Sequence, residues 1–487
     1  MAGASLWQLL KPTVKAGLRL FKPLKRGVRR IPSMRIVVHT RKQLLPPPLA
    51  MLRRFMRPDV TYVGVTGSCG KTTTTSLIGA VLSLRGESCT DARNGVERVI
   101  DNILTIGPNT RFCVQEISGS RPGRIRLMTK FLRPQIGVVT TVGNDHYKNF
   151  RSLEATAREK SELVAVLPRG GTAILNADDP HVIAMRNRTR ARVITYGLSR
   201  EADVRGEDVH SAWPLCLSLT VSHGQEKLRL QTRLVGEFWT TSVLAAIACG
   251  MSQGLDLQAC ARAIAVFEPV FGRASVHALP DGPIYLLETQ KAPLWTIANT
   301  MTIMRTAHAP RKTMVIGTVS DYSGKGGETH RKVARMALAV ADRVIFVGPQ
   351  ANHVDKLRQG NDRDRLFSFV TSYQAASFLA ETAVPNELIH IKASITDHLE
   401  RILLARLGDV VCWQERCGME SSCRDCKYYP VPHPPPFGLD QAEAGGEAGE
   451  ELEPVEMAPS RAAHRPKNRS KKAAPNLFQS PEGRIMR

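Results

Sequence analysis

Residues 61–73 read TYVGVTGSCGKTT, and this stretch decides the fold of the 487-residue chain. Its first half, Thr61–Thr66, is a β-branched apolar run typical of a buried strand, and a helical pattern follows from Thr72 to Leu84. Between them, Gly67 and Gly70 let backbone N–H groups approach phosphate oxygens, and the start of the helix adds a favourable dipole. The sequence therefore predicts a phosphate-binding loop between a strand and a helix.

The loop supplies the candidate nucleotide ligands. Lys71 is expected to reach the terminal phosphates, and the Thr72 hydroxyl is expected to bind Mg²⁺. The longer phosphate-loop pattern has Gly or Ala where this chain has Val65, so only the short form Gly-x-x-Gly-Lys-Thr-Thr remains. The alternative is a glycine-rich turn beside a chance Lys-Thr pair, which the strand–loop–helix context disfavours. The predicted nucleotide-binding set of the loop is Gly67, Ser68, Cys69, Gly70, Lys71, Thr72 and Thr73.

Strand and helix patterns alternate along most of the chain. After the loop, strand-like runs occupy Phe112–Ile117, Ile136–Val142 and Thr172–Leu175, with a helical stretch at Leu153–Leu167. This alternation predicts an α/β domain with a mostly parallel sheet. The short segments between Ala202 and Leu234 predict antiparallel strands instead. Helices are then expected at Ser242–Gly250 and Leu257–Phe267.

A second α/β pattern begins after Gly272 and Arg273. Its expected strands are Ile284–Leu287, Thr313–Ile316, Arg343–Val347 and Leu388–Ile391, and its expected helices are Leu294–Arg305, His330–Val340 and Ile395–Leu407. From Pro430 the chain becomes Pro-rich, then Glu/Gly-rich, then Lys/Arg-rich. Such a composition predicts a disordered tail, because it cannot bury enough apolar surface to offset its conformational entropy.

Seven segments between Val60 and Leu407 resemble, in the same order, motifs of the muramyl-ligase (Mur ligase) superfamily, which also includes folylpolyglutamate synthases and cyanophycin synthetase. By texture, the chain is most similar to the member that adds the terminal dipeptide to the muramyl peptide. The resembling segments are Thr66–Thr73, Val114–Ser118, Thr140–His146, Glu154–Glu162, Asn176–Asp179, Phe271–Arg273, and Ile391–Ser394 with Leu399–Glu400.

The resemblance implies an ATP-dependent ligase that joins a carboxylate to an amine through an acyl phosphate. It implies a central P-loop ATPase domain and a C-terminal Rossmann-like α/β domain. The expected division is a basic segment at 1–57, the ATP-binding domain at 58–272, the Rossmann-like domain at 273–411, a cysteine cluster at 412–429 and a tail at 430–487.

The resemblance also implies roles for residues outside the loop. Glu116 joins Thr72 at one Mg²⁺ ion, and His146 with a carbamylated Lys160 supports a second cation, since a carbamate offers the oxygen ligand that Mg²⁺ prefers. Lys71, Lys160 and His146 are the expected catalytic residues, and Asn176, Asp179 and Arg273 are further nucleotide contacts. The alternatives are an ordinary strand-end carboxylate at Glu116, a loop histidine at His146 and a helix-surface lysine at Lys160.

Three departures from the family pattern bear on the substrate. Only a basic segment of about 57 residues precedes the phosphate loop, where the family has a domain that holds the UDP-sugar, so we expect a substrate other than a standard UDP-muramyl peptide. Residues Gly236–Ser242 read GEFWTTS where the family has Gly-x-His-Asn-x-x-Asn. Residues Glu288–Pro293 read ETQKAP where members often have Asp-Tyr-Ala-His-x-Pro. Two rival functions remain: an amide ligase that builds a polyglutamate-like polymer or a tailoring bond, and a nucleotide-binding regulatory or scaffold protein that has lost ligation.

The net charge of +23 predicts an anionic partner. Met1–Pro58 contains no acidic residue, and apolar residues recur there at roughly helical spacing. This pattern suits an anionic membrane surface, an organelle transit peptide, or a solvated arm that packs on the next domain. No apolar run reaches the roughly 18–20 residues of a spanning helix. We therefore expect a cytoplasmic protein, peripheral to the inner face of the membrane if the first interpretation holds, and no nucleic-acid partner.

Four cysteines cluster near the C-terminus: Cys412, Cys417, Cys423 and Cys426. Four thiols within so short a stretch suit a tetrahedral Zn²⁺ site, with His433 as a substitute ligand, although the spacing is not that of a standard zinc ribbon. An Fe–S cluster is disfavoured, because the spacing does not match ferredoxin runs. The remaining alternative is a set of free or redox-active thiols.

Overall fold

The computed structural model describes residues 46–144 and 147–433. The sequence predictions for His146, for the basic segment before residue 46 and for the tail from residue 434 lie outside the described residues. Among the helices of the described part, none is both long enough and apolar enough to span a bilayer.

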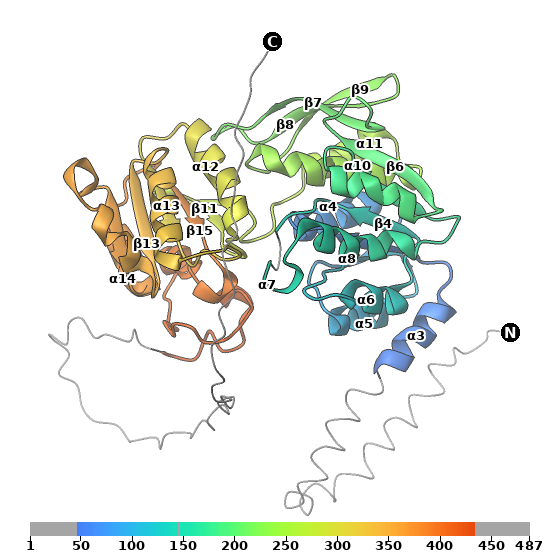
Figure 1. The fold of residues 1–487 in the computed structure, drawn as a ribbon, viewed down its shortest axis with the longest axis horizontal. Coiled ribbons are helices and arrows are strands. Elements are labelled where there is room, and N and C mark those ends of the chain that lie inside the picture. The colour runs from blue at the N-terminus through green and yellow to red at the C-terminus, as the bar shows by residue number, and fades with distance from the viewer. Residues whose placement is uncertain (1–45, 145–146, 434–487) are drawn as a thin grey trace, which may run out of the picture. The chain divides into compact units, whose positions relative to one another are not determined.

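A nine-stranded sheet carries the first half of the described chain (Figure 1). Its strand order is β2-β3-β1-β4-β5-β6-β7-β8-β9, with parallel pairing from β2 to β7 and antiparallel pairing in the last two steps. The near-continuous apolar sequence of the central strands follows from their burial on both faces. The strands are β1 (Thr61–Thr66), β2 (Glu87–Asp91), β3 (Thr110–Glu116), β4 (Ile136–Val139), β5 (Thr172–Asn176), β6 (Arg192–Gly197), β7 (Val204–His210), β8 (Ser218–His223) and β9 (Glu226–Gln231).

The prediction of an α/β fold with a mostly parallel sheet is confirmed. The antiparallel strands expected after Ala202 are β8 and β9, whereas β7 pairs in parallel with β6. The sequence patterns did not reveal β2, because its residues, ESCTD, are polar and it lies at the edge of the sheet.

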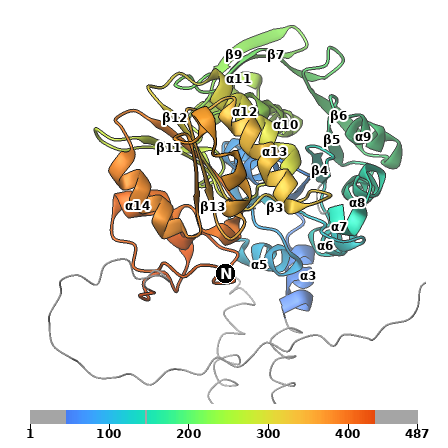
Figure 2. The same ribbon diagram turned by 60° about the vertical axis from the view of Figure 1, so that its left-hand side comes forward.

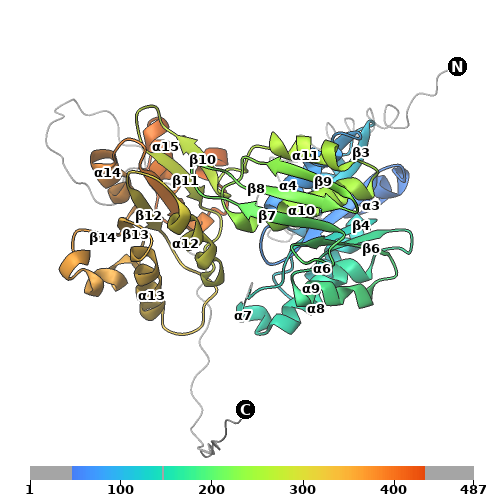
Figure 3. The same cartoon turned by 90° about the horizontal axis from the view of Figure 1, so that it is seen from above.

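Helices cover both faces of this sheet (Figure 3). One face carries α4 (Lys71–Leu82), α10 (Thr240–Ser252) and α11 (Leu257–Ala265), which pack on one another. The other carries α5 (Val96–Thr105), α6 (Arg124–Leu132), α8 (Leu153–Ala165) and α9 (Pro180–Ile183). Before β1, helix α3 (Pro46–Met56) packs on α5 and α6. Two short helices, α7 (Tyr147–Phe150) and η3 (Ala184–Arg188), complete this part.

A six-stranded sheet forms the second half, in the order β10-β11-β15-β12-β13-β14. Only β10 runs antiparallel to its neighbour. Helices α12 and α13 lie on one face, and α14 and α15 lie on the other (Figures 2 and 3). The elements are β10 (Ser275–Ala278), β11 (Ile284–Glu288), α12 (Ile297–Thr306), β12 (Lys312–Ile316), α13 (Gly326–Leu338), β13 (Arg343–Val347), β14 (Leu366–Phe369), α14 (Ser372–Thr382), β15 (Leu388–Lys392) and α15 (Arg401–Leu407).

Two predicted helices are interrupted in the structure. The one expected at Leu294–Arg305 begins as the 3₁₀ turn η5 (Leu294–Thr296) before α12. The one expected at Ile395–Leu407 is the 3₁₀ turn η8 (Ile395–Asp397), then His398 in a left-handed conformation with φ 53°, then α15. Ser394 and Asp397 form a capping box that closes the start of the short turn, and the left-handed His398 separates the turn from α15.

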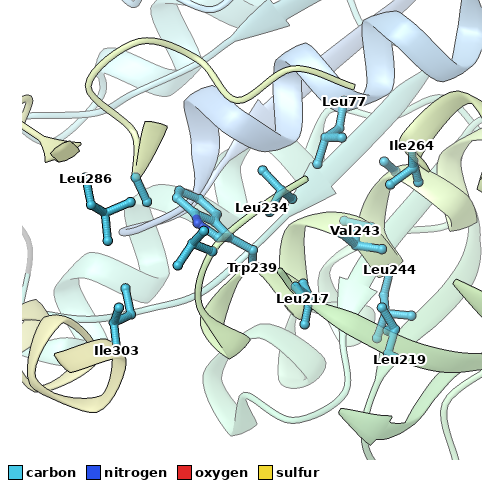
Figure 4. Packing of buried hydrophobic residues seen from close by; sticks show 14 of the residues in the cluster. Leu77, Leu217, Leu219, Leu234, Trp239, Val243, Leu244, Ile264, Leu286 and Ile303 are labelled. Atoms are coloured by element: carbon cyan, nitrogen blue, oxygen red, sulfur yellow. The ribbon is translucent and has the colours of Figure 1, made fainter. Parts of the chain in front are cut away.

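One large apolar core contains residues of both sheets and their helices. Figure 4 shows the Trp239 indole among the buried side chains of this core, which include Leu234, Leu286 and Ile303. Trp239 is 4% exposed and belongs to η4 (Glu237–Trp239), the turn that precedes α10. Trp239 therefore contributes an aromatic ring to the packing shared by the two sheets.

Candidate nucleotide and ligation site

The phosphate loop is held in shape by the segment that follows β4. Gly67 has φ 151°, and a Cβ atom there would lie 1.8 Å from Thr140 Oγ1, so no other residue fits without displacement. Thr140 Oγ1 donates to the Cys69 carbonyl over 2.6 Å, and the Ser68 N–H donates to the Thr141 carbonyl over 2.8 Å. Two of the segments that carry the family resemblance are thus joined by hydrogen bonds.

Lys71 is buried at the first position of α4. Its Nζ donates to the Gly67 carbonyl over 2.8 Å and lies 3.5 Å from the Ser68 carbonyl. The preceding Gly70 takes the left-handed conformation, φ 76°, at the N-cap of the helix. The ammonium group therefore lies within the curve of the loop, at the positive end of the helix dipole.

Oxygen ligands meet beside the loop. The Thr72 hydroxyl donates to Glu116 Oε2 over 2.7 Å, and Asn94 Nδ2 lies 3.3 Å from Glu116 Oε1. Glu116 ends β3, directly beside Val65 of β1, so the parallel register brings the carboxylate to the loop. A hydroxyl and a carboxylate are a hard donor set that fits Mg²⁺. Asn94 was not identified from the sequence, because it lies between β2 and α5 in no recognised motif.

Arg273 reaches this group from the start of the second half. Its Nη2 donates to Thr72 Oγ1 over 3.1 Å. Burial lowers the pKa of Arg273, and the nearby Glu116 carboxylate opposes that shift. Gly272, just before it, has φ 73°, and a Cβ there would lie 2.8 Å from Thr289 Oγ1. The glycine thus permits the tight turn that directs Arg273 toward the loop.

A charged cluster lies at the ends of β11 and β15. Glu288 Oε1 lies 2.5 Å from Lys392 Nζ, and Glu288 Oε2 lies 3.3 Å from His390 Nε2. Burial alone would raise the pKa of Glu288, but Lys392 and His390 lower it to about 2. Burial also raises the pKa of Cys69, and the charges of Lys392 and Lys71 oppose that rise. The charge of Lys392 therefore acts on the loop residue Cys69. The only sequence feature that pointed to Lys392 was its place in the Ile391–Ser394 motif.

Asn176 and Asp179 hold strand ends together. Asn176 Nδ2 donates to the Thr140 carbonyl over 2.9 Å, and Asp179 Oδ2 accepts from the Val142 N–H over 2.7 Å. Asp179 also caps α9. These bonds fix the segment that supports the phosphate loop. The contact of either residue with a nucleotide base stays a prediction.

Lys160 is 1% exposed on α8, so the alternative of a helix-surface lysine is wrong. Its neighbour Glu159 is also buried and accepts backbone N–H groups of Gly123 and Ile125 over 2.7 and 2.8 Å. The carbamylation of Lys160 stays a prediction.

The altered segment Gly236–Ser242 lies directly behind the loop. Thr74 Oγ1 donates to Ser242 Oγ over 2.9 Å, and a Cβ on Gly70 would lie 3.1 Å from the same oxygen. Trp239, where the family has Asn, points into the apolar core. The two positions that are Asn in the family thus hold a hydroxyl behind the loop and a buried indole.

The four clustered cysteines do not form a common ligand set in the described part of the chain, which corrects the sequence prediction. The guanidinium of Arg401 lies between two of them: its Nε donates to Cys423 Sγ over 3.2 Å, and its Nη2 lies 4.0 Å from Cys412 Sγ. Cys417 Sγ lies 3.1 Å from His398 Nε2 instead. Cys423 is grouped with His398 and Glu400 rather than with the other cysteines.

Comparison with known proteins identifies relatives. Residues 65–250 match the model of the Mur ligase middle domain. The UDP-N-acetylmuramoyl-tripeptide–D-alanyl-D-alanine ligase of Mycobacterium leprae is 27% identical over 393 residues, which cover 74% of this chain and 76% of that protein. The UDP-N-acetylmuramate–L-alanine ligase of Xylella fastidiosa is 32% identical over 240 residues, 47% of this chain and 48% of that protein.

A solved structure shares the fold. Crystal structure II of MurF from Acinetobacter baumannii superposes with a TM-score of 0.67 at 19% identity and covers 74% of this chain and 79% of that one. Fold, loop and relatives together define the class of the protein, an ATP-dependent carboxylate–amine ligase. Within that class, residues 65–250 match the Mur ligase middle domain, and the chain is similar to a Mur ligase over 74% of its length.

Proposed function

We propose that this ligase uses ATP and Mg²⁺ to join a carboxylate to an amine other than those of a standard UDP-muramyl peptide. The observation that carries the proposal is the meeting of Thr72, Glu116 and Arg273, because three distant segments bring a hydroxyl, a carboxylate and a guanidinium to the phosphate loop. The proposal includes a boundary between the ATP-binding domain and the Rossmann-like domain at Gly272. Arg273 lies just after this boundary, and its side chain contacts Thr72 of the ATP-binding domain.

The chemistry assigned to these residues is phosphoryl transfer followed by acyl transfer. A carboxylate oxygen of the substrate attacks the γ-phosphorus, the bond to the β-phosphate oxygen breaks, and ADP leaves. The amine then attacks the acyl carbon, loses a proton, and displaces phosphate. Lys71 and Arg273 would stabilise the charge on the transferred group, and Thr72 and Glu116 would hold Mg²⁺, which shields the phosphate charges.

The altered residues support a changed substrate. Trp239 and Ser242 stand where the family has two Asn residues, and Lys291 stands where it often has His. The Asn amide offers an NH₂ donor and a carbonyl acceptor, whereas the Trp indole offers only one donor. The shorter Ser hydroxyl can donate and accept, but it does so from a single oxygen atom. The relatives named above act on UDP-muramyl compounds, so a muramyl peptide remains the alternative substrate.

A membrane surface is the proposed partner of the N-terminal region. On α3, Leu52, Phe55 and Met56 are exposed, with Phe55 exposed to 80%. Arg53 and Arg54 stand among them, although both also donate to backbone carbonyls of the ATP-binding part. Exposed apolar side chains beside a basic segment that lacks acidic residues fit an anionic lipid surface.

The decisive experiment is a substrate-dependent assay of phosphate release from ATP, with pairs of carboxylates and amino acids that include a muramyl tripeptide. We expect one non-muramyl pair to stimulate release, and hydroxylamine to trap the acyl phosphate as a hydroxamate when the amine is omitted. Stimulation by the muramyl tripeptide alone would contradict the changed substrate. Unstimulated turnover without hydroxamate for every pair would favour the regulatory or scaffold function.

A further inference from the structure

The segment after α15 folds back onto the second sheet's helices. Trp413 N–H donates to the His433 carbonyl over 2.7 Å, and His433 N–H donates to the Val411 carbonyl over 2.9 Å. The Trp413 ring packs edge-on against Tyr373 of α14 at 5.1 Å between centroids. Residues 411–433 are therefore a structured extension rather than a linker.

Three different metal-ligand side chains converge under this extension. His398, Glu400 and Cys423 place one ligand atom each within 4.8 Å of the others, and within the described ranges no other group of three or more such residues does so. The three side chains are 2%, 1% and 3% exposed. Two of them follow η8, and Cys423 begins η9 (Cys423–Asp425), so the group joins the extension to the end of β15.

Two polar atoms of this group are buried without a hydrogen-bond partner among the described residues: His398 Nδ1 and Glu400 Oε2. The other carboxylate oxygen of Glu400 is used, since it accepts the Cys423 N–H over 2.8 Å. An unsatisfied buried polar atom costs about 1–3 kcal/mol, and two beside each other are unusual in a folded core. A bound cation would satisfy both at once.

The remaining contacts orient the three ligands. His398 Nε2 lies 3.1 Å from Cys417 Sγ, which leaves Nδ1 directed toward Glu400, 3.8 Å from Oε1. A histidine that binds a metal through one nitrogen commonly uses the other in an outer hydrogen bond of this kind. Arg401 likewise donates to Cys423 Sγ over 3.2 Å and to the Gln414 carbonyl over 2.9 Å, which holds the sulfur beside His398 and Glu400.

We propose that His398 Nδ1, Glu400 and Cys423 Sγ bind one Zn²⁺ ion, with Cys417 and Arg401 as outer hydrogen-bond partners. Imidazole, thiolate and carboxylate together match Zn²⁺, whereas Mg²⁺ does not bind sulfur. The ion fastens the extension to the turn after β15, whose Asp397 also accepts from the Thr318 N–H and hydroxyl.

The test is metal analysis of the purified full-length protein and four variants. We expect about one equivalent of zinc in the wild type and in Cys426→Ser, whose thiol is outside the group, and loss of zinc in Cys423→Ser and His398→Asn. Cys417→Ser should retain the site but weaken affinity about 10–100-fold in competition with a chelator. Equal loss of zinc in Cys426→Ser and Cys423→Ser would overturn this ligand set in favour of a four-cysteine site.

A second measurement uses the wild-type protein, so that it tests the site even if the variants do not fold. Chelator-treated wild-type protein is titrated with Co²⁺, and we expect saturation at one equivalent with thiolate-to-cobalt charge-transfer absorption, reversed by Zn²⁺ and unaffected by Mg²⁺. Chelation should also lower the Tm. Absence of zinc and iron from anaerobically prepared protein, together with no Co²⁺ absorption, would overturn the site whatever the ligase assay shows.

Discussion

The phosphate loop, Gly67–Thr73, and the segment behind it, Gly236–Ser242, are in contact but differ in kind. The loop keeps the family motif, and its side chains are engaged in polar contacts with Glu116 and Arg273. The segment has Trp239 and Ser242 at the two positions where the family has Asn, and the Trp239 indole is buried in the core shared by the two sheets. The contrast indicates that the chain keeps the residues of the phosphate-binding motif and differs from the family in the segment that packs behind the motif.

The substitution expected to have the largest effect on the phosphate loop is Lys71→Ala. We expect ATP turnover to fall on the order of 10³-fold, because the variant removes a preorganised positive charge from the transferring phosphoryl group. Lys130→Ala, an exposed lysine on α6, is the matched control. Steady-state phosphate release with circular dichroism as a folding check measures the effect, and wild-type rates in a folded Lys71→Ala protein would refute the loop assignment.

A smaller loss is expected at Lys160. Its burial on α8 is compatible with a carbamylated side chain that helps to position a cation. We expect Lys160→Ala to lower turnover by at least about 10–100-fold, because the variant removes an oxygen ligand of the second cation, with partial recovery on adding bicarbonate or a short carboxylic acid. Turnover unchanged in the variant, or an unmodified lysine in intact-mass measurements with activity retained, would exclude this role.

Stability measurements test the segment Gly236–Ser242, which packs behind the phosphate loop. Trp239→Ala removes a large buried ring and should lower the free energy of unfolding by about 3–5 kcal/mol. Phe55→Ala, which truncates an aromatic ring exposed to 80%, should change it by less than about 0.5 kcal/mol. Urea unfolding of both variants provides the measurement. Similar small changes in the two would mean that Trp239 does not carry the packing between the sheets.

The ion pair of Glu288 and Lys392 predicts a pH-dependent difference. The pKa of Glu288 is lowered to about 2 in the folded protein, below its ordinary value of 4.5, so its stabilisation is present above about pH 4.5 and is lost as pH falls toward 2. Between about pH 6 and pH 3 the wild type should therefore lose a large part of its stability advantage over Glu288→Gln. A constant difference in unfolding free energy across that range would show that the carboxylate is not paired in solution.

The smallest effect concerns membrane attachment. Each Lys or Arg near an anionic surface contributes on the order of 1 kcal/mol, and salt screens it. We expect full-length protein to bind anionic vesicles at low salt, with weaker binding by Phe55→Glu. Truncation before Pro46 should release the protein while ATP turnover persists, because it keeps α3, which packs on α5 and α6. Equal partitioning of full-length and truncated protein would remove the membrane from the list of partners.

Most of the nucleotide side was predictable from the sequence. The strand–loop–helix motif at Thr61–Leu82 is local, since the glycines and the 3.6-residue period act over a few positions, and its elements appear within two residues of their expected bounds. Glu116 needed only the parallel register of β1 and β3 to reach Thr72. Asn94 and the polar strand β2 were missed, because neither carries a pattern that burial or period would reveal.

What the sequence by itself determined is therefore the motif residues and many of the elements, because periodicity and turn chemistry depend on neighbours in the chain. Helices α5, α6 and α14 and strands β6, β10 and β14 were not predicted. Tertiary structure alone decided that Lys160 is buried, that Trp239 joins two sheets, and that Arg401 separates the cysteines while His398 and Glu400 meet Cys423. Those outcomes depend on contacts between residues far apart in the sequence. The free energy of burying a charge or a ring is set by what surrounds it, which no local pattern encodes.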